Sequence, residues 1–402
     1  MQKELKISAD KLLIFLILGM MFLSAMDFVN RFYVFAFLAF LFFVLTPSRR
    51  IHFDTSFFAL VALTVSLIAF DNTYQTGILN LLKAFPFLLC YMMGRSLYAT
   101  DSNRESTTEI REKQFTNVTY LMALGTFSHF ALNMIVNWGR GDRSTIEFWS
   151  RKALSATGQA TLGCIMIAVA VAVLFSKAAK RYKIVAGIAL AVIVAYNLIL
   201  AGRTIFVLIA IALVAAYFFQ RFSAGVGIWN FLKTVAIFAV IVTVVLTLYN
   251  VNLFGIKTRV EDSNFYDRFF DDEYSQEIEE DARFEYKLEY LENFTAGVLG
   301  GGKIRRIVGH HAHDIYLDTY DQASIFALGG LLVYIVMSVL RVVECVRRKN
   351  ISFEVKQLVF CVYLIVNVQF WTEPILEGSP WLFALYCFMD GSLAHLLAET
   401  KE

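Results

Sequence analysis

Three of the six histidines in this chain fall between Gly309 and Asp314, in the run Gly-His-His-Ala-His-Asp. Histidine changes its charge near neutral pH, so such a cluster indicates proton transfer, metal binding or anion binding. The run joins a long charged stretch to an apolar one, which places it at the surface of a predicted membrane. A solvated polar stretch that caps a helix is the simpler interpretation, and both stay open at this point.

The composition defines the class of protein. Of the 402 residues, 58% are hydrophobic and 17% are charged, and the mean hydropathy is +0.59. Soluble proteins are typically about 45–50% apolar, so we predict an all-α polytopic membrane protein. The five cysteines lie in or beside apolar segments without the paired spacing of a metal site or a disulfide framework, and we expect them to be core residues.

Apolar runs of about 20 residues predict about 12 transmembrane helices. They cover residues 11–29, 32–47, 54–70, 77–98, 116–138, 156–176, 184–201, 204–219, 233–253, 315–340, 356–374 and 380–398. The chain then divides into residues 1–253 with spans 1 to 9, a large outer loop at 254–312, and residues 313–402 with the last three spans. If both termini are cytoplasmic, most lysines and arginines of the loops lie on the cytoplasmic side, as the positive-inside rule requires. We therefore predict this topology.

The large outer loop between spans 9 and 10 has two unlike halves. The first half is densely acidic, and we interpret it as a solvated surface because it lacks calcium-loop spacing. In the second half, Phe284, Leu288 and Leu291 recur at helical spacing beside a stripe with Arg283 and Lys287, which predicts an amphipathic helix on the outer face of the bundle. The glycines at 297 and 300–302, followed by three cations, indicate either an anion-cradling turn or a flexible linker.

Several cations lie on the predicted outer side, against the topological bias. Arg140, Arg143 and Arg151 occur in the loop at 139–155, and Arg203 lies at the outer turn of a short helical hairpin. Charge at the membrane is costly, so these cations indicate an anionic partner. The alternatives are snorkelling to headgroup phosphate for Arg203 and an ordinary hydrophilic loop for Arg140 and Arg143.

The run His313-Asp314-Ile315-Tyr316-Leu317, followed by a glycine pair at 329–330, resembles the histidine motif of the bacterial O-antigen polymerase and O-antigen ligase superfamily. Further resemblances lie, in order, at Thr157-Gly158-Gln159, Gly202-Arg203-Thr204, Ala282-Arg283 and Glu373-Pro374, so the likeness runs from about residue 140 to residue 400. Many members have asparagine where this chain has Asp314; an aspartate there could orient His313 or raise its basicity.

The resemblance implies an inverting, GT-C-like glycosyltransferase that uses an undecaprenyl-diphosphate-linked oligosaccharide at the periplasmic face of the bacterial inner membrane. Arg203 and Arg283 would clamp the diphosphate, because the arginine fork suits phosphate oxygens. His313 would be the general base for the acceptor hydroxyl or would orient it. Additional substrate-binding candidates are Arg140, Arg143, Arg151, Asp314, Arg305, Arg306 and Glu373.

The implied partners are the lipid-linked donor and acceptor and membrane lipids, with a chain-length regulator as a further candidate and no nucleic acid. We expect no metal or other cofactor, because the arginines supply the positive charge that a divalent ion would bring. The family leaves open a polymerase or a ligase to lipid A-core, and we favour the polymerase. About 12 spans also fit a lipid-linked oligosaccharide flippase, but the chain lacks the two related halves usual in transporters.

Overall fold

The computed structural model describes residues 2–46, 51–70, 78–98, 107–138, 145–200, 202–223 and 282–398. The helices are α1 (Gln2–Ala25), α2 (Phe32–Val44), α3 (Thr55–Phe70), α4 (Ile78–Ser96), α5 (Thr108–Val136), α6 (Ala156–Phe175), α7 (Lys180–Leu200), α8 (Arg203–Ser223), α13 (Ala282–Glu292), α14 (Lys303–Val308), α15 (Ile315–Arg347), α16 (Phe353–Thr372), α17 (Ile375–Gly378) and α18 (Pro380–Leu397). Short 3-10 turns form η1 (Phe28–Asn30) and η4 (Phe294–Gly297), and β1 (Thr145–Ile146) pairs antiparallel with β2 (Ala153–Leu154).

This architecture confirms the prediction of an all-helical membrane protein. Within the described ranges, six helices are long and apolar enough to cross a membrane: α5, α6, α7, α8, α15 and α16. Every predicted span in these ranges coincides with a helix, whereas the predicted span at 233–253 and the acidic half of the outer loop lie outside them. The total of about 12 spans and the GT-C arrangement therefore stay predictions.

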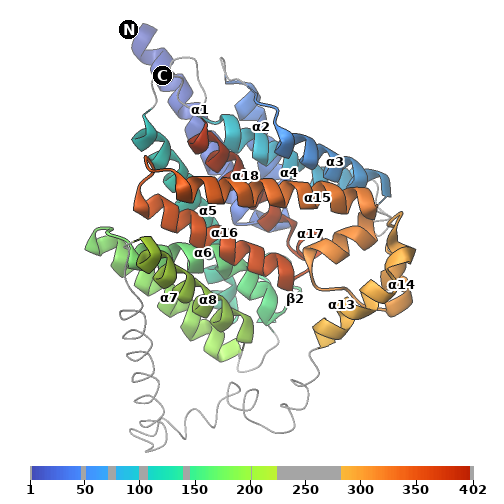
Figure 1. Ribbon diagram of the computed structural model, residues 1–402. Helices are drawn as coiled ribbons and strands as arrows, with labels where there is room; N and C mark the ends of the chain where they lie inside the picture. The colour runs from blue at the N-terminus through green and yellow to red at the C-terminus, as the bar shows by residue number, and fades with distance from the viewer. Residues whose placement is uncertain are drawn as a thin grey trace, which may run out of the picture.

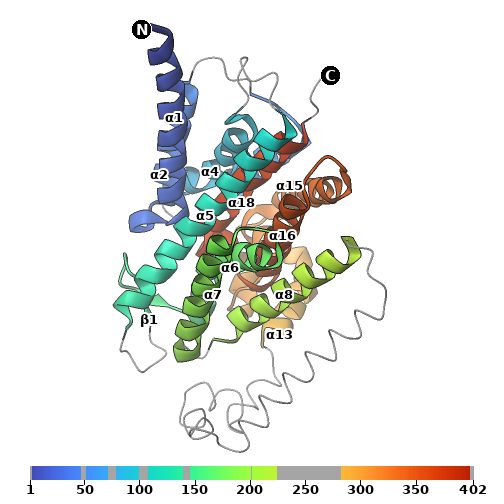
Figure 2. The same ribbon diagram turned by 90° about the vertical axis from the view of Figure 1, so that its left-hand side faces the viewer.

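The two ends of the bundle are unlike. Figures 1 and 2 show the start of α1 and the end of α18 at one end, while α13 and the hairpin of β1 and β2 lie toward the other. We call residues 282–314, which contain α13, η4 and α14 and lead into α15, the outer segment. Its distance from both termini fits the predicted topology, in which the termini share one side of the membrane and the outer loop occupies the other.

Close helix crossings at glycines hold the bundle together. A side chain at Gly94 of α4 would meet the Phe388 carbonyl oxygen at 2.1 Å, and one at Gly391 of α18 would meet the Tyr91 carbonyl oxygen at 2.3 Å. Likewise, Gly330 of α15 leaves no room for a side chain against the backbone of α3. In lipid, helices associate through tight packing rather than through hydrophobic burial, so small residues at crossings allow the backbones to approach.

A buried ion pair connects four of these helices. Arg341 of α15 donates to Asp390 of α18 through Nη2, at 2.8 Å, and through Nε, at 3.2 Å. Its Nη1 also donates to Ser56 of α3 at 2.9 Å and to the Tyr91 hydroxyl of α4 at 3.4 Å. Asp390 is fully buried and also accepts from Ser338 at 3.0 Å. Because each charge has several partners, the pair is satisfied within an apolar core.

We predict that Asp390→Ala will strongly destabilise the protein, because it leaves the Arg341 guanidinium buried without its counter-charge. The expected loss is about 3–5 kcal/mol of the free energy of unfolding. Thermal unfolding in detergent would measure it. The double variant Arg341→Met/Asp390→Leu removes both charges and should recover most of the lost stability; equal stability of Asp390→Ala and the wild type would contradict this account.

Candidate functional site

His313 occupies a strained position directly before α15. The side chain of Asp314 caps this helix, since its Oδ1 accepts the backbone N–H groups of Tyr316 at 2.9 Å and Leu317 at 2.7 Å. His313 itself has φ 56°, in the left-handed region. This conformation costs a residue other than glycine about 1–2 kcal/mol. Such strain is often held at functional sites, where the surrounding structure enforces it.

Three of the predicted site residues line one polar cavity of about 530 Å³. His313 lies there with Arg283 from α13 and Glu373 from the end of α16. The other lining residues are Asp27, Asn30, His129, Glu147, Ala153, Leu154, Ser155, Thr157, Gly158, Thr161, Leu162, Pro374, Ile375, Gly378, Ser379 and Trp381. Most of them lie at helix ends or in connecting turns, so the polar cavity is at one end of the bundle. Thr157, Gly158 and Glu373 belong to motifs that carried the family resemblance.

Arg283 is held against the end of α16. Its Nη1 lies 3.4 Å from Glu373 Oε1 and donates to the Thr372 carbonyl oxygen at 3.2 Å. The last carbonyls of a helix carry partial negative charge, which favours a cation there. Burial raises the pKa of Glu373, and the neighbouring Arg283 opposes this rise without cancelling it. The Arg283 side chain is 35% exposed, so a ligand in the cavity could reach the guanidinium.

His313 is neutral at physiological pH in this environment. Burial, followed by the positive charge of Arg283, lowers the pKa of His313 from 6.5 to about 4. Its Nδ1 is buried, and none of the described residues lies within hydrogen-bond distance of it. A buried polar nitrogen normally has a partner. Because His313 also lines the cavity, its ring could contact a polar group that enters there, such as a hydroxyl.

A second polar wall of the cavity was not predicted from the sequence. His129 Nε2 of α5 lies 2.9 Å from Glu147 Oε1, and Asn30 donates to Glu147 Oε2 at 2.9 Å. The backbone N–H of Trp149 donates to Glu147 at 2.7 Å, and that of Ser150 also donates. Burial raises the pKa of Glu147, but these hydrogen bonds outweigh it and hold the pKa below its usual range. Glu147 thus remains ionised and ties the hairpin loop to α5 and η1.

One signal in the sequence could have identified this wall. Asp27 and His129 lie inside the predicted spans 11–29 and 116–138, respectively. An ionisable residue within an apolar span is by default a candidate for function. A second signal is Glu147, which is the only acidic residue among the cations from 143 to 152.

The structure places Arg203 beside the cavity rather than in its lining. Arg203 is the first residue of α8. It follows Gly202, where an added side chain would lie 3.2 Å from Ala156 Cβ at the start of α6. The neighbouring residues Ser155 and Thr157 do line the cavity. A role for Arg203 in binding diphosphate stays a prediction.

Other predicted substrate-binding residues are engaged by the fold. Arg305 Nη1 donates to the two carboxylate oxygens of Glu377 at 3.0 and 3.1 Å, and Arg306 Nη2 donates to the Gly301 carbonyl at 2.7 Å. The guanidinium of Arg151 lies 5.5 Å from the centre of the Phe148 ring, outside the cavity lining. Arg140 and Arg143 lie outside the described residues.

Asp314 acts within the fold as a helix cap. Its side chain is 1% exposed, and its second oxygen lies 3.7 Å from Lys287 Nζ. Burial raises the pKa of Asp314, although the capping hydrogen bonds and Lys287 oppose the rise. The geometry therefore gives Asp314 a positioning role beside His313, whereas direct substrate contact has no support from its burial.

Two of the three clustered histidines pair with different carboxylates. His310 Nε2 pairs with Glu289 at 2.7 Å, and His311 Nδ1 lies 3.3 Å from Glu377. Burial lowers the pKa of His311, although Glu377 opposes this. In the part of the chain that the structure describes, no group of three or more His, Cys, Asp or Glu side chains could hold a metal ion.

The glycine-rich turn is neither an open anion cradle nor a simple linker. Gly300, Gly301 and Gly302 all have positive φ. Their backbone N–H groups donate to the carbonyls of Gly297, Gln322 and Asp321, each at 2.8 Å. These amides are therefore already paired, so the anion-cradle interpretation is wrong. The turn docks η4 and α14 onto the start of α15.

The amphipathic helix predicted after Asp281 is confirmed as α13. Its charged face is turned toward the protein and its apolar face away from it. Lys287 donates to the Trp371 carbonyl at 2.7 Å, and Arg283 contacts the end of α16 as described above. The charged stripe thus faces the protein. Phe284, Leu288 and Leu291, at 64%, 44% and 54% exposure, face away from it.

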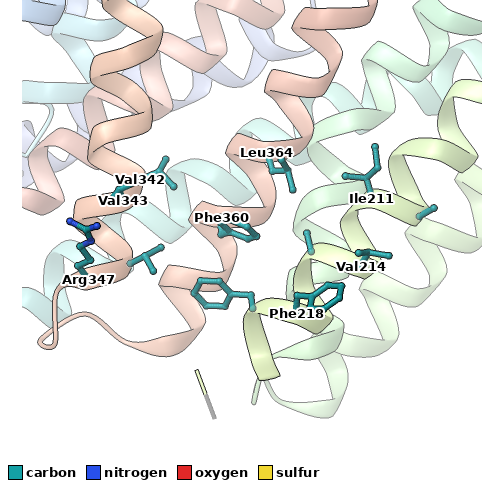
Figure 3. Close-up of a pocket in the computed structure, with 12 residues that line it drawn as sticks. Ile211, Val214, Phe218, Val342, Val343, Arg347, Phe360 and Leu364 are labelled. Atoms are coloured by element: carbon teal, nitrogen blue, oxygen red, sulfur yellow. The ribbon is translucent and has the colours of Figure 1, made fainter. Parts of the chain in front are cut away.

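A larger cavity of about 820 Å³ lies between α8, α15 and α16. Figure 3 shows Ile211, Val214 and Phe218 of α8 across from Phe360 and Leu364 of α16, with Arg347 near one end. Its lining is otherwise apolar. Apart from Arg347, this cavity has no acidic, basic or polar side chain, so we place the candidate site in the polar cavity.

No protein-family model matches this chain, and no curated protein is found to be similar to it. The assignment of function therefore rests on the residues themselves and on the geometry of the polar cavity.

We predict that His313→Gly will be more stable than His313→Ala by about 1 kcal/mol, because glycine adopts the left-handed conformation without the steric cost that alanine retains. Paired thermal unfolding curves in detergent would measure the difference. Both variants lose the imidazole, so the comparison isolates the backbone. Equal stability, or a more stable alanine variant, would show that the position is not strained.

Proposed function

We propose that this protein is an inverting glycosyltransferase that polymerises polyprenyl-diphosphate-linked oligosaccharide repeat units at the outer face of a bacterial inner membrane. The observation that supports it most is the meeting of Arg283, His313 and Glu373 in one polar cavity at the end of the bundle away from the termini. These residues come from three motifs that are far apart in the sequence. Their convergence is what a shared role in one reaction requires.

Arg283 is suited to bind the diphosphate of the donor. A guanidinium has five N–H donors in a planar fork, so Arg283 can keep its contacts with Glu373 and Thr372 and still bind a phosphate oxygen. Negative charge grows on the diphosphate as the glycosidic bond breaks, and a fixed cation stabilises it. Arg203, which begins α8 beside the cavity, is the second candidate for this role.

His313 would bind the acceptor hydroxyl. Its pKa of about 4 keeps the ring neutral at pH 7, so it neither repels Arg283 nor competes for the diphosphate as a cation. His313 lines the cavity, and its buried Nδ1 has no hydrogen-bond partner among the described residues. Holding the acceptor in a reactive orientation lowers the barrier by reducing the entropy lost in the transition state.

A ligase that transfers the glycan to lipid A-core is the alternative within the same family, and the acceptor alone distinguishes it. A flippase is a weaker candidate. Transporters usually bind substrate at the bilayer midplane through broken helices. The polar cavity is instead formed mostly by helix ends and by the turns that connect them.

Reconstituted protein should extend a polyprenyl-diphosphate-linked oligosaccharide into longer lipid-linked chains, separated by electrophoresis or mass spectrometry. We expect the reaction to proceed in excess EDTA, because Arg283 and Arg203 would supply the charge otherwise brought by a metal. Transfer only when lipid A-core is added would identify a ligase. Movement of intact donor across the bilayer, with no new glycosidic bond, would contradict the proposal and indicate a flippase.

Arg283→Lys and Arg203→Lys should each lower the rate of transfer by about 10-fold or more, which corresponds to about 1.4 kcal/mol in the barrier. Lysine keeps the charge but loses the bidentate fork. Arg181→Lys, at an exposed position at the start of α7, is the matched control and should retain the wild-type rate. Unchanged rates for Arg203→Lys and Arg283→Lys would exclude them as diphosphate clamps.

A further inference from the structure

We infer, on the basis of the function proposed above, that Asp27 on the second wall of the polar cavity takes the proton from the acceptor hydroxyl. The sequence motifs assign nothing to this residue. Asp27 lines the same cavity as Arg283, His313 and Glu373, and it belongs to the turn between α1 and α2. It is therefore supplied by a part of the chain that precedes all the recognised motifs.

The turn that carries Asp27 is held in an unusual conformation. Asp27, Val29 and Asn30 have φ of 42°, 51° and 56°, all in the left-handed region. A β-branched residue such as Val29 is a genuine outlier there. Three such residues within four positions cost several kcal/mol in total, at about 1–3 kcal/mol each, and strain of this size persists only where the surrounding structure enforces it.

The contacts that hold this turn in place join it to other residues around the cavity. Asp27 Oδ1 accepts the Phe32 backbone N–H at 3.0 Å, which fixes the carboxylate relative to α2. Asn30 donates to Glu147 at 2.9 Å, and the Phe28 ring packs edge-on against Trp149, with centroids 4.7 Å apart. The turn is thus fixed to the loop that follows β1. Glu147, whose oxygens already accept four hydrogen bonds, acts here as a positioning residue.

The surrounding charges favour Asp27 over His313 as the base. The pKa of Asp27 is raised to about 7, chiefly by burial and also by the charge of Glu147, whereas the Phe32 N–H hydrogen bond and the charges of Lys83 and Arg31 oppose the rise. The other titratable groups that line the cavity are His129, Arg283, His313 and Glu373. A general base works best when its pKa lies near the working pH. Asp27 meets this condition at neutral pH, whereas His313, with a pKa of about 4, is a weak proton acceptor.

The proposed step balances without any further reagent. The acceptor hydroxyl oxygen attacks the anomeric carbon of the donor, and its proton passes to the ionised Asp27 carboxylate. The bond between the anomeric carbon and the diphosphate oxygen breaks, and its electron pair stays on the diphosphate, where Arg283 stabilises the charge. Asp27 then releases the proton to water. His313 holds the acceptor hydroxyl during this step and is not itself protonated.

Asp27→Asn tests the inference with little disturbance to the turn. Asparagine tolerates a left-handed conformation as aspartate does, and its amide oxygen can still accept the Phe32 N–H. We expect kcat with reconstituted lipid-linked oligosaccharide to fall about 100-fold or more, while the KM for the donor changes by less than about three-fold. Asp10→Asn, on the same helix α1, is the matched control and should keep the wild-type rate.

The pH profile supplies a readout that a merely structural role would not move. Wild-type kcat/KM should fall below about pH 7, close to 10-fold per pH unit, as Asp27 becomes protonated. This limb should be absent in Asp27→Asn and present in His313→Gln. Asp27→Glu keeps a carboxylate and should retain part of the rate, which separates loss of the base from loss of folding.

The possible failures are distinguishable. Asp27→Asn with a wild-type kcat, or with an unchanged acid limb, would overturn the role of Asp27 and leave the proposed function intact. An acid limb that disappears in His313→Gln instead would assign the base to His313. Absence of any glycan transfer by the wild type would overturn the proposed function and, with it, the role of Asp27.

Discussion

Charge withdrawn from water must find partners within the protein, and this constraint organises the molecule. In the core, Arg341 of α15 and Asp390 of α18 satisfy each other together with hydroxyls of α3 and α4, so one ion pair fixes four helices. At the far end of the bundle, Arg283 pairs with Glu373 and thereby anchors the outer segment to α16. The same rule accounts for the inward charged stripe of α13, whose side chains Phe284, Leu288 and Leu291 point away from the protein.

Two nitrogens beside the polar cavity do not meet this constraint. The Nδ1 atoms of His129 and His313 are buried, and no described residue is within hydrogen-bond distance of either. Left-handed backbone occurs at His313 and in the turn that carries Asp27. Unsatisfied nitrogens and strained backbone both cost stability, and strained backbone is often found at functional sites. The two walls also carry groups with different pKa values. The pKa of Asp27 lies near neutrality and that of His313 lies well below it, and such a difference is typical of acid–base sites.

Sequence reasoning reached one wall of this site and missed the other, for a physical reason. Arg283, His313 and Glu373 stand in short motifs at predicted membrane surfaces, so their residue types and order were visible in the chain. Asp27 and His129 stand alone inside apolar runs, and nothing local indicates which other residues they meet. The anion-cradle interpretation of Gly300–Gly302 failed for a similar reason: the carbonyls that occupy the amides of Gly301 and Gly302 come from α15, and the Gly300 amide donates to Gly297.

The sequence by itself determined the helical membrane class, because apolar runs of this length can satisfy their backbone only as helices. It also determined where helices lie within the described residues, α13 included, since these follow from local hydrophobic periodicity. Only the tertiary structure decided which charges face each other, how α13 is turned, and that Asp27, His129 and Glu147 share a cavity with His313. Those outcomes depend on contacts between segments that are far apart in the sequence, such as Asn30 with Glu147, and such contacts are set by the packing of the whole bundle.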